Sequence, residues 1–190
     1  MPEEIEAKVR IADPEAFRRR MADLARSAGE TVFEVNRLFD DPEGSLRERG
    51  SALRVREEFR LPDGVRLRTV LTFKGPVAPG PLKRRPELEL EVEAAEPLVA
   101  IFEALGLSEA FRYEKRRTPY RGGACEVVLD QVPHLGWFAE VEGPTEEAVL
   151  ADLAELGFAD ASSIRASYIR LLHDHLESLG RDPARAVFEE

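Results

Sequence analysis

The chain begins with a segment in which charged and apolar residues alternate. In EEIEAKVRI, residues 3–11, the even positions carry Glu4, Glu6, Lys8 and Arg10, whereas positions 5, 7, 9 and 11 are apolar. A two-residue period predicts a β-strand, because successive side chains of a strand point to opposite faces. One face of this strand would therefore present carboxylates that can bind a divalent cation, next to basic groups that can bind an anion.

Similar charged faces recur in later segments, some acidic and others basic. PELELEVE, residues 86–93, places its glutamates on one face, whereas ALRVREEF, residues 52–59, places Arg54 and Arg56 on one face. Two carboxylates at positions i and i+2 lie about 7 Å apart and repel each other by about 2–3 kcal/mol at an effective dielectric constant near 20. A polar face that simply meets water explains any one of these strands taken alone.

The whole set is explained better if these faces line one closed interior. Buried charges are costly unless they are paired or bind ligands. Divalent cations satisfy carboxylates, and all-oxygen ligation favours magnesium or manganese over zinc. A polyanion satisfies the basic groups, since Arg binds phosphate oxygens in bidentate fashion. The charge pattern therefore predicts a site for metal ions together with a polyphosphate.

Hydrophobic periodicity and turn signals predict the elements that hold this site. The expected strands are residues 3–11, 31–40, 52–59, 65–75, 86–93, 111–120, 124–132 and 136–143, and the expected helices are residues 13–29, 96–106, 145–156 and 163–179. Each half reads strand–helix–strand–strand–strand, which indicates a duplicated unit. We expect an α+β fold, an eight-stranded antiparallel β-barrel with helices packed outside it. Leu88 and Leu90 should then face a core shared with the helices.

Length and composition favour a single domain over residues 1–180, followed by a flexible C-terminal tail at 181–190. The formal net charge of −10 argues against a nucleic-acid partner, and no apolar run approaches the roughly 20 residues of a membrane span. The single cysteine, Cys125, excludes an intramolecular disulfide or a Cys-based zinc site and fits a cytoplasmic protein. Neither a P-loop nor an H-E-x-x-H motif occurs.

Several blocks of the sequence, taken in order, resemble the CYTH domain. They are EIEAK, LFDDPEGSLRERGSALRVR, LTFKGP, RPELELEV, EKRRTPY, LDQVPHLGWFAEVEG and SYIRLL, and they extend over residues 3–173. This domain is shared by class IV adenylyl cyclases and thiamine triphosphatases, within the group called triphosphate tunnel metalloenzymes. The LDxVxxLGxFxEVE block is most similar to the cyclase and thiamine-triphosphatase branch.

The resemblance assigns roles to the charged residues. It implies that the metal ligands are Glu4, Glu6, Asp130, Glu140 and Glu142, and that Glu87 and Glu89 either hold a second ion or orient basic residues. It implies a triphosphate clamp of Lys8, Arg54, Arg56, Lys74, Lys115 and Arg117, in which Lys8, Lys74 and Arg117 also stabilise charge that develops on the phosphates. The expected cofactor is Mg²⁺ or Mn²⁺, as two ions. Tyr168 matches the terminal SY of the family, either as a packing residue or as a site residue.

The resemblance leaves the reaction open. A class IV cyclase converts ATP to cyclic AMP and pyrophosphate, whereas an inorganic triphosphatase or thiamine triphosphatase directs water at the terminal phosphate. Recognition of the base would separate these cases, and the sequence contains no readable adenine pocket. We rank cyclisation first and hydrolysis as the alternative. A third hypothesis, a non-catalytic module that binds polyphosphate or nucleotide, predicts the loss of a ligand carboxylate. The expected partner is a small-molecule triphosphate, and the family suggests a homodimer.

Overall fold

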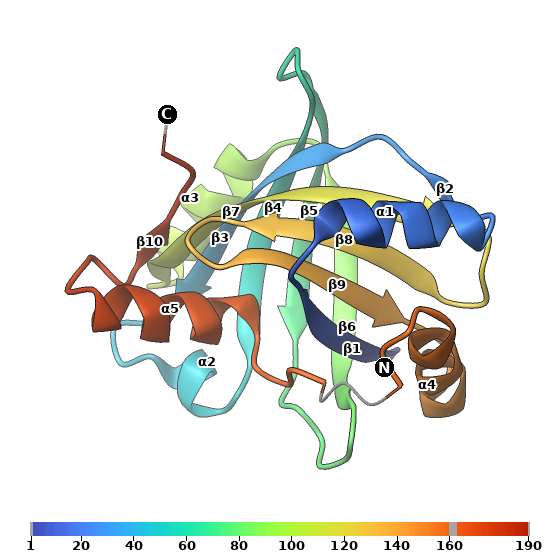
Figure 1. Cartoon of the computed structure of the whole chain (residues 1–190). Helices are drawn as coiled ribbons and strands as arrows, with labels where there is room; N and C mark the ends of the chain where they lie inside the picture. The colour runs from blue at the N-terminus through green and yellow to red at the C-terminus, as the bar shows by residue number, and fades with distance from the viewer. Residues whose placement is uncertain (1, 160–162, 190) are drawn as a thin grey trace.

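The computed structural model describes residues 2–159 and 163–189, and its centre is a closed β-barrel (Figure 1). The eight barrel strands are β1 (Glu3–Ile11), β3 (Val32–Asp40), β4 (Ala52–Arg60), β5 (Arg66–Lys74), β6 (Lys83–Val92), β7 (Ser108–Arg121), β8 (Glu126–Val132) and β9 (Gly136–Glu142). They pair in the order β7-β3-β4-β5-β6-β1-β9-β8, and β8 pairs back to β7. All these pairings are antiparallel, which confirms the predicted barrel.

The strand order in the barrel is consistent with the duplication predicted from the sequence. The first half contributes β1, β3, β4 and β5, and the second contributes β6, β7, β8 and β9. Exchanging each strand with its counterpart in the other half leaves the cyclic order unchanged. The two halves are therefore related in the barrel as well as in the sequence.

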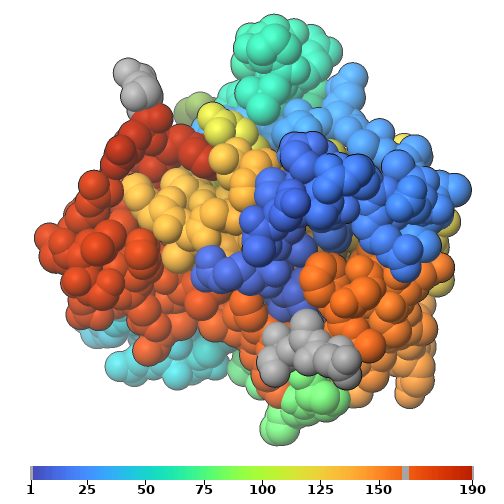
Figure 2. Space-filling model, viewed as in Figure 1, coloured from blue at the N-terminus to red at the C-terminus, as the bar shows by residue number. Residues whose placement is uncertain are grey.

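Helices pack against the barrel in three places. α1 (Pro14–Asp23) and α4 (Glu146–Glu155) lie together over β1, β8 and β9, as Figures 1 and 2 show, and their apolar side chains share one core with those strands. α3 (Ala95–Ala104) packs on β3 and β4, where Phe39 and Phe102 have ring centroids 5.1 Å apart. α5 (Tyr168–Ser178) shares a third core with residues of β3, β7, β8 and β9. No helix in the described part of the chain is long and apolar enough to cross a membrane.

The first helix is shorter than predicted. α1 ends at Asp23, and residues 27–28 form a short strand, β2 (Ser27–Ala28), that pairs with β7. The backbone N–H of Arg26 donates to the carbonyl of Met21, and Ala25 has a φ of 55°, which together form a Schellman ending. The prediction was wrong because the left-handed position that ends the helix is usually a glycine, which can be recognised in a sequence, whereas here it is an alanine.

Two further expectations about the outer surface fail. Leu88 and Leu90 are 46% and 61% exposed on β6, because α3 covers β3 and β4 instead. Residues 185–186, expected to lie in a loose tail, form β10 (Arg185–Ala186), which pairs in parallel with β7 and buries Ala186. The C-terminal segment is therefore part of the fold.

Candidate active site

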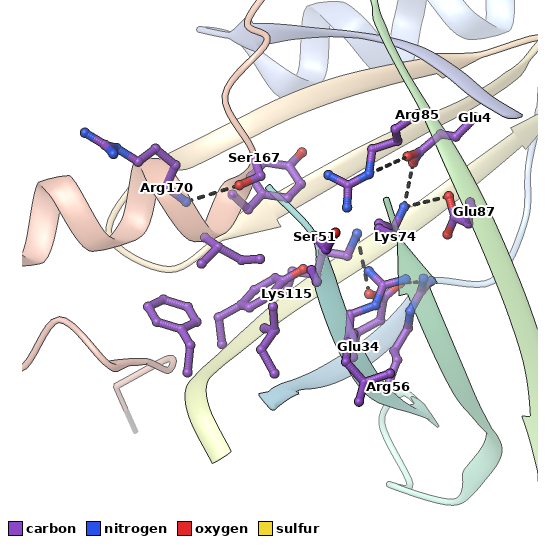
Figure 3. A pocket seen from close by; sticks show the side chains of 18 of the residues that line it. Glu4, Glu34, Ser51, Arg56, Lys74, Arg85, Glu87, Lys115, Ser167 and Arg170 are labelled. Atoms are coloured by element: carbon purple, nitrogen blue, oxygen red, sulfur yellow. Dashed lines mark hydrogen bonds and ion pairs between the residues drawn. The ribbon is translucent and has the colours of Figure 1, made fainter. Parts of the chain in front are cut away.

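The interior of the barrel is a cavity of about 1280 Å³, which we call the tunnel. Side chains from all eight barrel strands line it, and the loop at 41–51 and the first turns of α5 complete its wall. Figure 3 shows Ser167, which precedes α5, and Arg170 of α5 on one side of this space and Glu4, Lys74 and Glu87 on the other. The side chains of a barrel strand point alternately into and out of the barrel. The charged side chains that the sequence pattern places on one face of each strand are the ones that point inward.

The structure brings nearly all of the predicted site residues together. Those that line the tunnel are Glu4, Glu6, Lys8, Arg54, Arg56, Lys74, Glu87, Glu89, Lys115, Arg117, Glu140 and Glu142. Tyr168 lines it as well, from the first turn of α5. Asp130 is the exception, since it is fully buried in the wall behind the tunnel surface.

Strand register places acids opposite bases. Glu4 on β1 stands opposite Arg85 on β6, and Lys8 on β1 stands opposite Glu140 on β9. Lys74 on β5 likewise stands opposite Glu87 on β6. Directly opposed residues have Cβ atoms about 5 Å apart, so each of these pairs can form an ion pair across the strands.

On the acidic side of the tunnel, lysines and arginines hold the glutamates. Lys74 Nζ lies 2.7 Å from Glu4 Oε1 and 2.7 Å from Glu87 Oε2, while Lys83 pairs with Glu6. Burial alone would raise the pKa of Glu4, but Lys74, Lys83 and Arg85 outweigh it and lower that pKa to about 2. The second oxygen of Glu4, Oε2, is buried and accepts no hydrogen bond from the described residues.

On the basic side, one glutamate faces several cations. Glu34 on β3 is fully buried, and its carboxylate lies 3.4 Å from Lys115, 3.6 Å from Arg56 and 3.6 Å from Arg117. Burial would raise its pKa, but these cations hold the pKa of Glu34 well below its usual range. Glu34 therefore balances the charge of the clamp when no phosphate is bound.

Sequence reasoning missed Glu34, Lys83 and Arg85. Lys83 and Arg85 lie four and two residues before Glu87 on β6, so the alternation that selected Glu87 also selects them. Glu34 could have been found in the same way, because it shares the inward phase of β3 with Asn36. The alternation was present in each case. The expected strand at 86–93 began after Lys83 and Arg85, and the expected strand at 31–40 was not examined for charged residues on its inward face.

The tunnel carboxylates have the oxygen chemistry that a hard divalent cation prefers, although among the described residues no three of them come within 4.8 Å of one another. Glu4, Glu6, Glu140 and Glu142 offer oxygen ligands from the two neighbouring strands β1 and β9, and Glu4 Oε2 accepts no hydrogen bond from the described residues and lies 3.7 Å from Arg85 Nε. Burial and the nearby carboxylates of Glu4, Glu6 and Glu87 raise the pKa of Glu142 to about 7, which reflects excess negative charge at this point. An ion bound here would relieve that repulsion and would have to displace Lys74 and Lys83 from their carboxylates.

A second group of metal-capable side chains lies on the surface. Among the described residues, three such groups come within 4.8 Å of one another only at His173, Asp174 and Glu177 on α5. Asp174 is already paired with Arg170 at 2.7 Å, and both Asp174 and Glu177 are exposed. None of these three residues has a buried side-chain atom that lacks a hydrogen bond, as Glu4 Oε2 does, so we do not assign a function to the group.

The raised pKa of Glu142 gives a stability prediction for the metal-free protein. The folded state holds this proton more tightly than the unfolded chain does, so stability falls as pH rises from about 4.5 to about 7. Glu142→Gln removes that loss and should stabilise the fold by about 1 kcal/mol at pH 8, after a discount for solvent screening, with no gain near pH 4. Thermal unfolding in EDTA should show a rise in Tm of about 2–4 °C at pH 8 only. An equal rise in Tm at pH 4 and pH 8 would contradict the assignment of this proton to Glu142.

One part of the tunnel wall is apolar. Leu38 on β3 lies between Phe111 on β7 and Arg54 on β4, and Ala52 lies opposite Lys74. These apolar side chains line the tunnel together with Ile169 of α5. An apolar surface therefore lies directly beside the basic clamp, because its residues and the clamp residues are on neighbouring, paired strands.

Comparison with known proteins identifies the family. The profile of the CYTH domain matches residues 2–168. The chain belongs to the CYTH family. Two relatives support this assignment. The adenylate cyclase CyaB of Aeromonas hydrophila is 31% identical over 186 residues, which cover 91% of this chain and 90% of the relative. A Methanocaldococcus jannaschii protein that is provisionally described as an adenylate cyclase is 30% identical over 177 residues, covering 88% of this chain and 97% of the relative.

A solved structure agrees with the fold. A protein from Hippeastrum, provisionally named an adenylyl cyclase and reported with a dominant triphosphatase activity, superposes with a TM-score of 0.69. It is 20% identical to this chain, and the match covers 94% of this chain and 97% of the Hippeastrum chain. At this identity the likeness establishes the barrel alone.

Proposed function

We propose that this protein is a metal-dependent enzyme that acts on a small-molecule triphosphate inside the tunnel, with ATP cyclisation as the first candidate reaction. The observation that carries the proposal is the pairing of two charge clusters in one enclosed space. Carboxylates of β1 and β9 line the same tunnel as basic residues of β4, β5 and β7. A triphosphate with divalent cations is the ligand class that satisfies both clusters.

The basic residues would bind and orient the phosphates. Arg54 and Arg56 can donate to phosphate oxygens in bidentate fashion, and Lys8, Lys74, Lys115 and Arg117 add point charges around the chain of phosphates. Lys8, Lys74 and Arg117 would stabilise the negative charge that develops as the bond to the leaving phosphate breaks. Lys8, Arg54 and Lys115 are buried, which strengthens their interactions with charged groups.

The metal ligands that we propose are Glu4, Glu6, Glu140 and Glu142, with Glu87 and Glu89 as ligands of a second ion or as partners of the basic residues. Bound Mg²⁺ or Mn²⁺ would activate the attacking oxygen and neutralise the leaving phosphate oxygens. Asp130 was also predicted as a ligand, but its oxygens accept hydrogen bonds from Lys115, Arg117 and Tyr168, so we assign it a different role below.

Two observations favour different reactions. The apolar wall of Leu38, Phe111 and Ile169 beside Arg54 can accommodate a base attached to the phosphates, which supports a nucleotide substrate and cyclisation. The triphosphatase activity reported for the Hippeastrum neighbour supports hydrolysis as the alternative. The two reactions share the clamp and the metal ions and differ only in the attacking oxygen, which is the ribose 3′-hydroxyl in one case and water in the other.

A product assay separates these reactions. The purified protein is incubated with ATP, inorganic triphosphate or thiamine triphosphate, each with Mg²⁺ or Mn²⁺, and the products are resolved by chromatography. Cyclic AMP with pyrophosphate from ATP supports the cyclase, and orthophosphate from any of the three supports a triphosphatase. The absence of turnover with all three substrates and both metals would contradict the proposal and leave a binding module.

A further inference from the structure

We propose that Tyr168 is a positioning residue, whose hydroxyl fixes Asp130 and, through Asp130, the cationic groups of Arg117 and Lys115 that face the tunnel. This inference rests on the proposed function, since it assigns how the clamp is held in shape. It gives Asp130 a role in the wall of the tunnel instead of at a metal ion, and it makes the C-terminal helix α5 a part of the site.

Asp130 is at the centre of this arrangement. Its Oδ2 accepts hydrogen bonds from the Tyr168 hydroxyl at 3.0 Å, from Lys115 Nζ at 3.2 Å and from Arg117 at 2.7 Å. Its Oδ1 accepts a further hydrogen bond from Arg117 Nε at 2.8 Å. The carboxylate is fully buried, so these four donors replace water around it. With its oxygens engaged in this way, Asp130 is suited to hold cations in place.

Arg117 is held in one orientation by this carboxylate. Asp130 engages Nε and one terminal nitrogen of the guanidinium group in a bidentate pair, and Glu140 accepts from the same terminal nitrogen. The other terminal nitrogen makes no hydrogen bond to the described residues and belongs to a side chain that lines the tunnel. The pair therefore leaves a donor group available for a phosphate in a fixed direction.

Tyr168 also contacts the lysines of the clamp. Lys8 Nζ lies 3.9 Å from the centroid of the Tyr168 ring, and Lys115 Nζ lies 5.5 Å from it, so both ammonium groups can make cation–π contacts. The preceding segment binds Lys8 as well: Lys8 Nζ donates to the carbonyl of Ala166 at 3.2 Å, and the N–H of Ile164 donates to the carbonyl of Lys8 at 2.7 Å. The segment that leads into α5 thus fixes the lysine of the first strand.

The ring and the hydroxyl of Tyr168 can be separated by mutation. Tyr168→Phe keeps the ring, its packing on Phe138 and its contacts with the lysines, but removes the hydrogen bond to Asp130. We expect the variant to bind inorganic triphosphate about 10-fold more weakly, because residues that support a direct ligand typically contribute a factor of 10–100. Calorimetric titration in EDTA measures this without turnover.

A double-mutant cycle separates positioning from general stability. In an Arg117→Lys background the bidentate pair is absent, so Tyr168→Phe should have an effect of less than about 2-fold there. A purely structural role would give the same loss in both backgrounds. Tyr120→Phe is the matched control, because Tyr120 is buried outside the tunnel in the core under α1, and it should leave the affinity unchanged.

The outcomes of this experiment distinguish a positioning role of Tyr168 from a purely structural one. A 10-fold loss that disappears in the Arg117→Lys background supports the inference. Wild-type affinity in Tyr168→Phe, or equal losses in both backgrounds, would overturn it while leaving the proposed function intact. If the natural protein itself does not bind inorganic triphosphate, with or without Mn²⁺, the proposed function fails and this inference fails with it.

Discussion

Glu4→Gln combined with Glu6→Gln is expected to lower metal-dependent turnover by about 1000-fold or more, because the two carboxylates supply neighbouring oxygen ligands from one strand. Glutamine keeps the shape of each side chain, so the barrel should remain folded. Steady-state rates with Mg²⁺ and with Mn²⁺, on the best substrate from the product assay, measure the effect, and circular dichroism checks the fold.

The matched control for this pair is Glu91→Gln combined with Glu93→Gln. These glutamates also stand two residues apart, but they are exposed near the end of β6 and do not line the tunnel. We expect less than a 2-fold change in rate for the control. Retention of metal-dependent turnover in the Glu4 and Glu6 variant would remove the metal assignment, whatever the control does.

Arg54→Ala or Lys74→Ala is expected to weaken the binding of inorganic triphosphate by about 10–100-fold, the range of one or two charge-assisted hydrogen bonds. The loss should be smaller for pyrophosphate, because the shorter ligand lacks phosphates that these residues contact. Calorimetric titrations with the two ligands give the comparison, and Arg84→Ala is the control. Arg84 is next to Lys83 and Arg85 in sequence but pairs with Glu3 and Glu146 on the outside.

Equal losses for the two ligands would show that Arg54 and Lys74 do not read the length of the phosphate chain. Lys74 has a second effect that Arg54 lacks, since its removal frees Glu4 and Glu87 from an ion pair. Metal binding in Lys74→Ala could therefore change even if the phosphate contacts do not. Agreement between the two variants is the stronger evidence for the clamp.

Many of the charged side chains in the tunnel pair with one another. Each cluster of carboxylates faces a cluster of lysines and arginines, and pairs such as Glu4 with Lys74 and Glu140 with Lys8 satisfy both groups. Binding of metal and triphosphate would exchange these internal pairs for contacts with the ligands. Internal pairing therefore lowers the cost of holding many ionised groups inside the barrel.

The sequence predicted which side chains face inward more accurately than which side chains touch. Alternation in β1, β4 and β6 identified Glu4, Arg54 and Glu87 as inward-facing, and the structure places all three in the tunnel. Alternation fixes the phase of a strand but not its neighbours, because register depends on pairing between distant segments. That is why the contacts of Asp130 with Arg117 and Tyr168 could not be derived from the sequence.

The failures outside the site have similar physical causes. Leu88 and Leu90 alternate with glutamates in the way that core residues do, yet whether a helix covers them depends on where α3 packs. β10 was missed because a two-residue strand has no period to detect, and its pairing with β7 comes from tertiary contact alone. Local pattern therefore predicted the barrel, and tertiary packing determined its covering.

The most direct test of the central claim is a crystal structure of the protein with Mn²⁺ and a non-hydrolysable triphosphate analogue, with anomalous diffraction to locate the metal. We expect manganese peaks within about 2.5 Å of carboxylate oxygens of Glu4 and Glu6, with the phosphates against Arg54 and Arg56. Manganese at His173, Asp174 and Glu177 instead, or phosphates bound outside the tunnel, would contradict it.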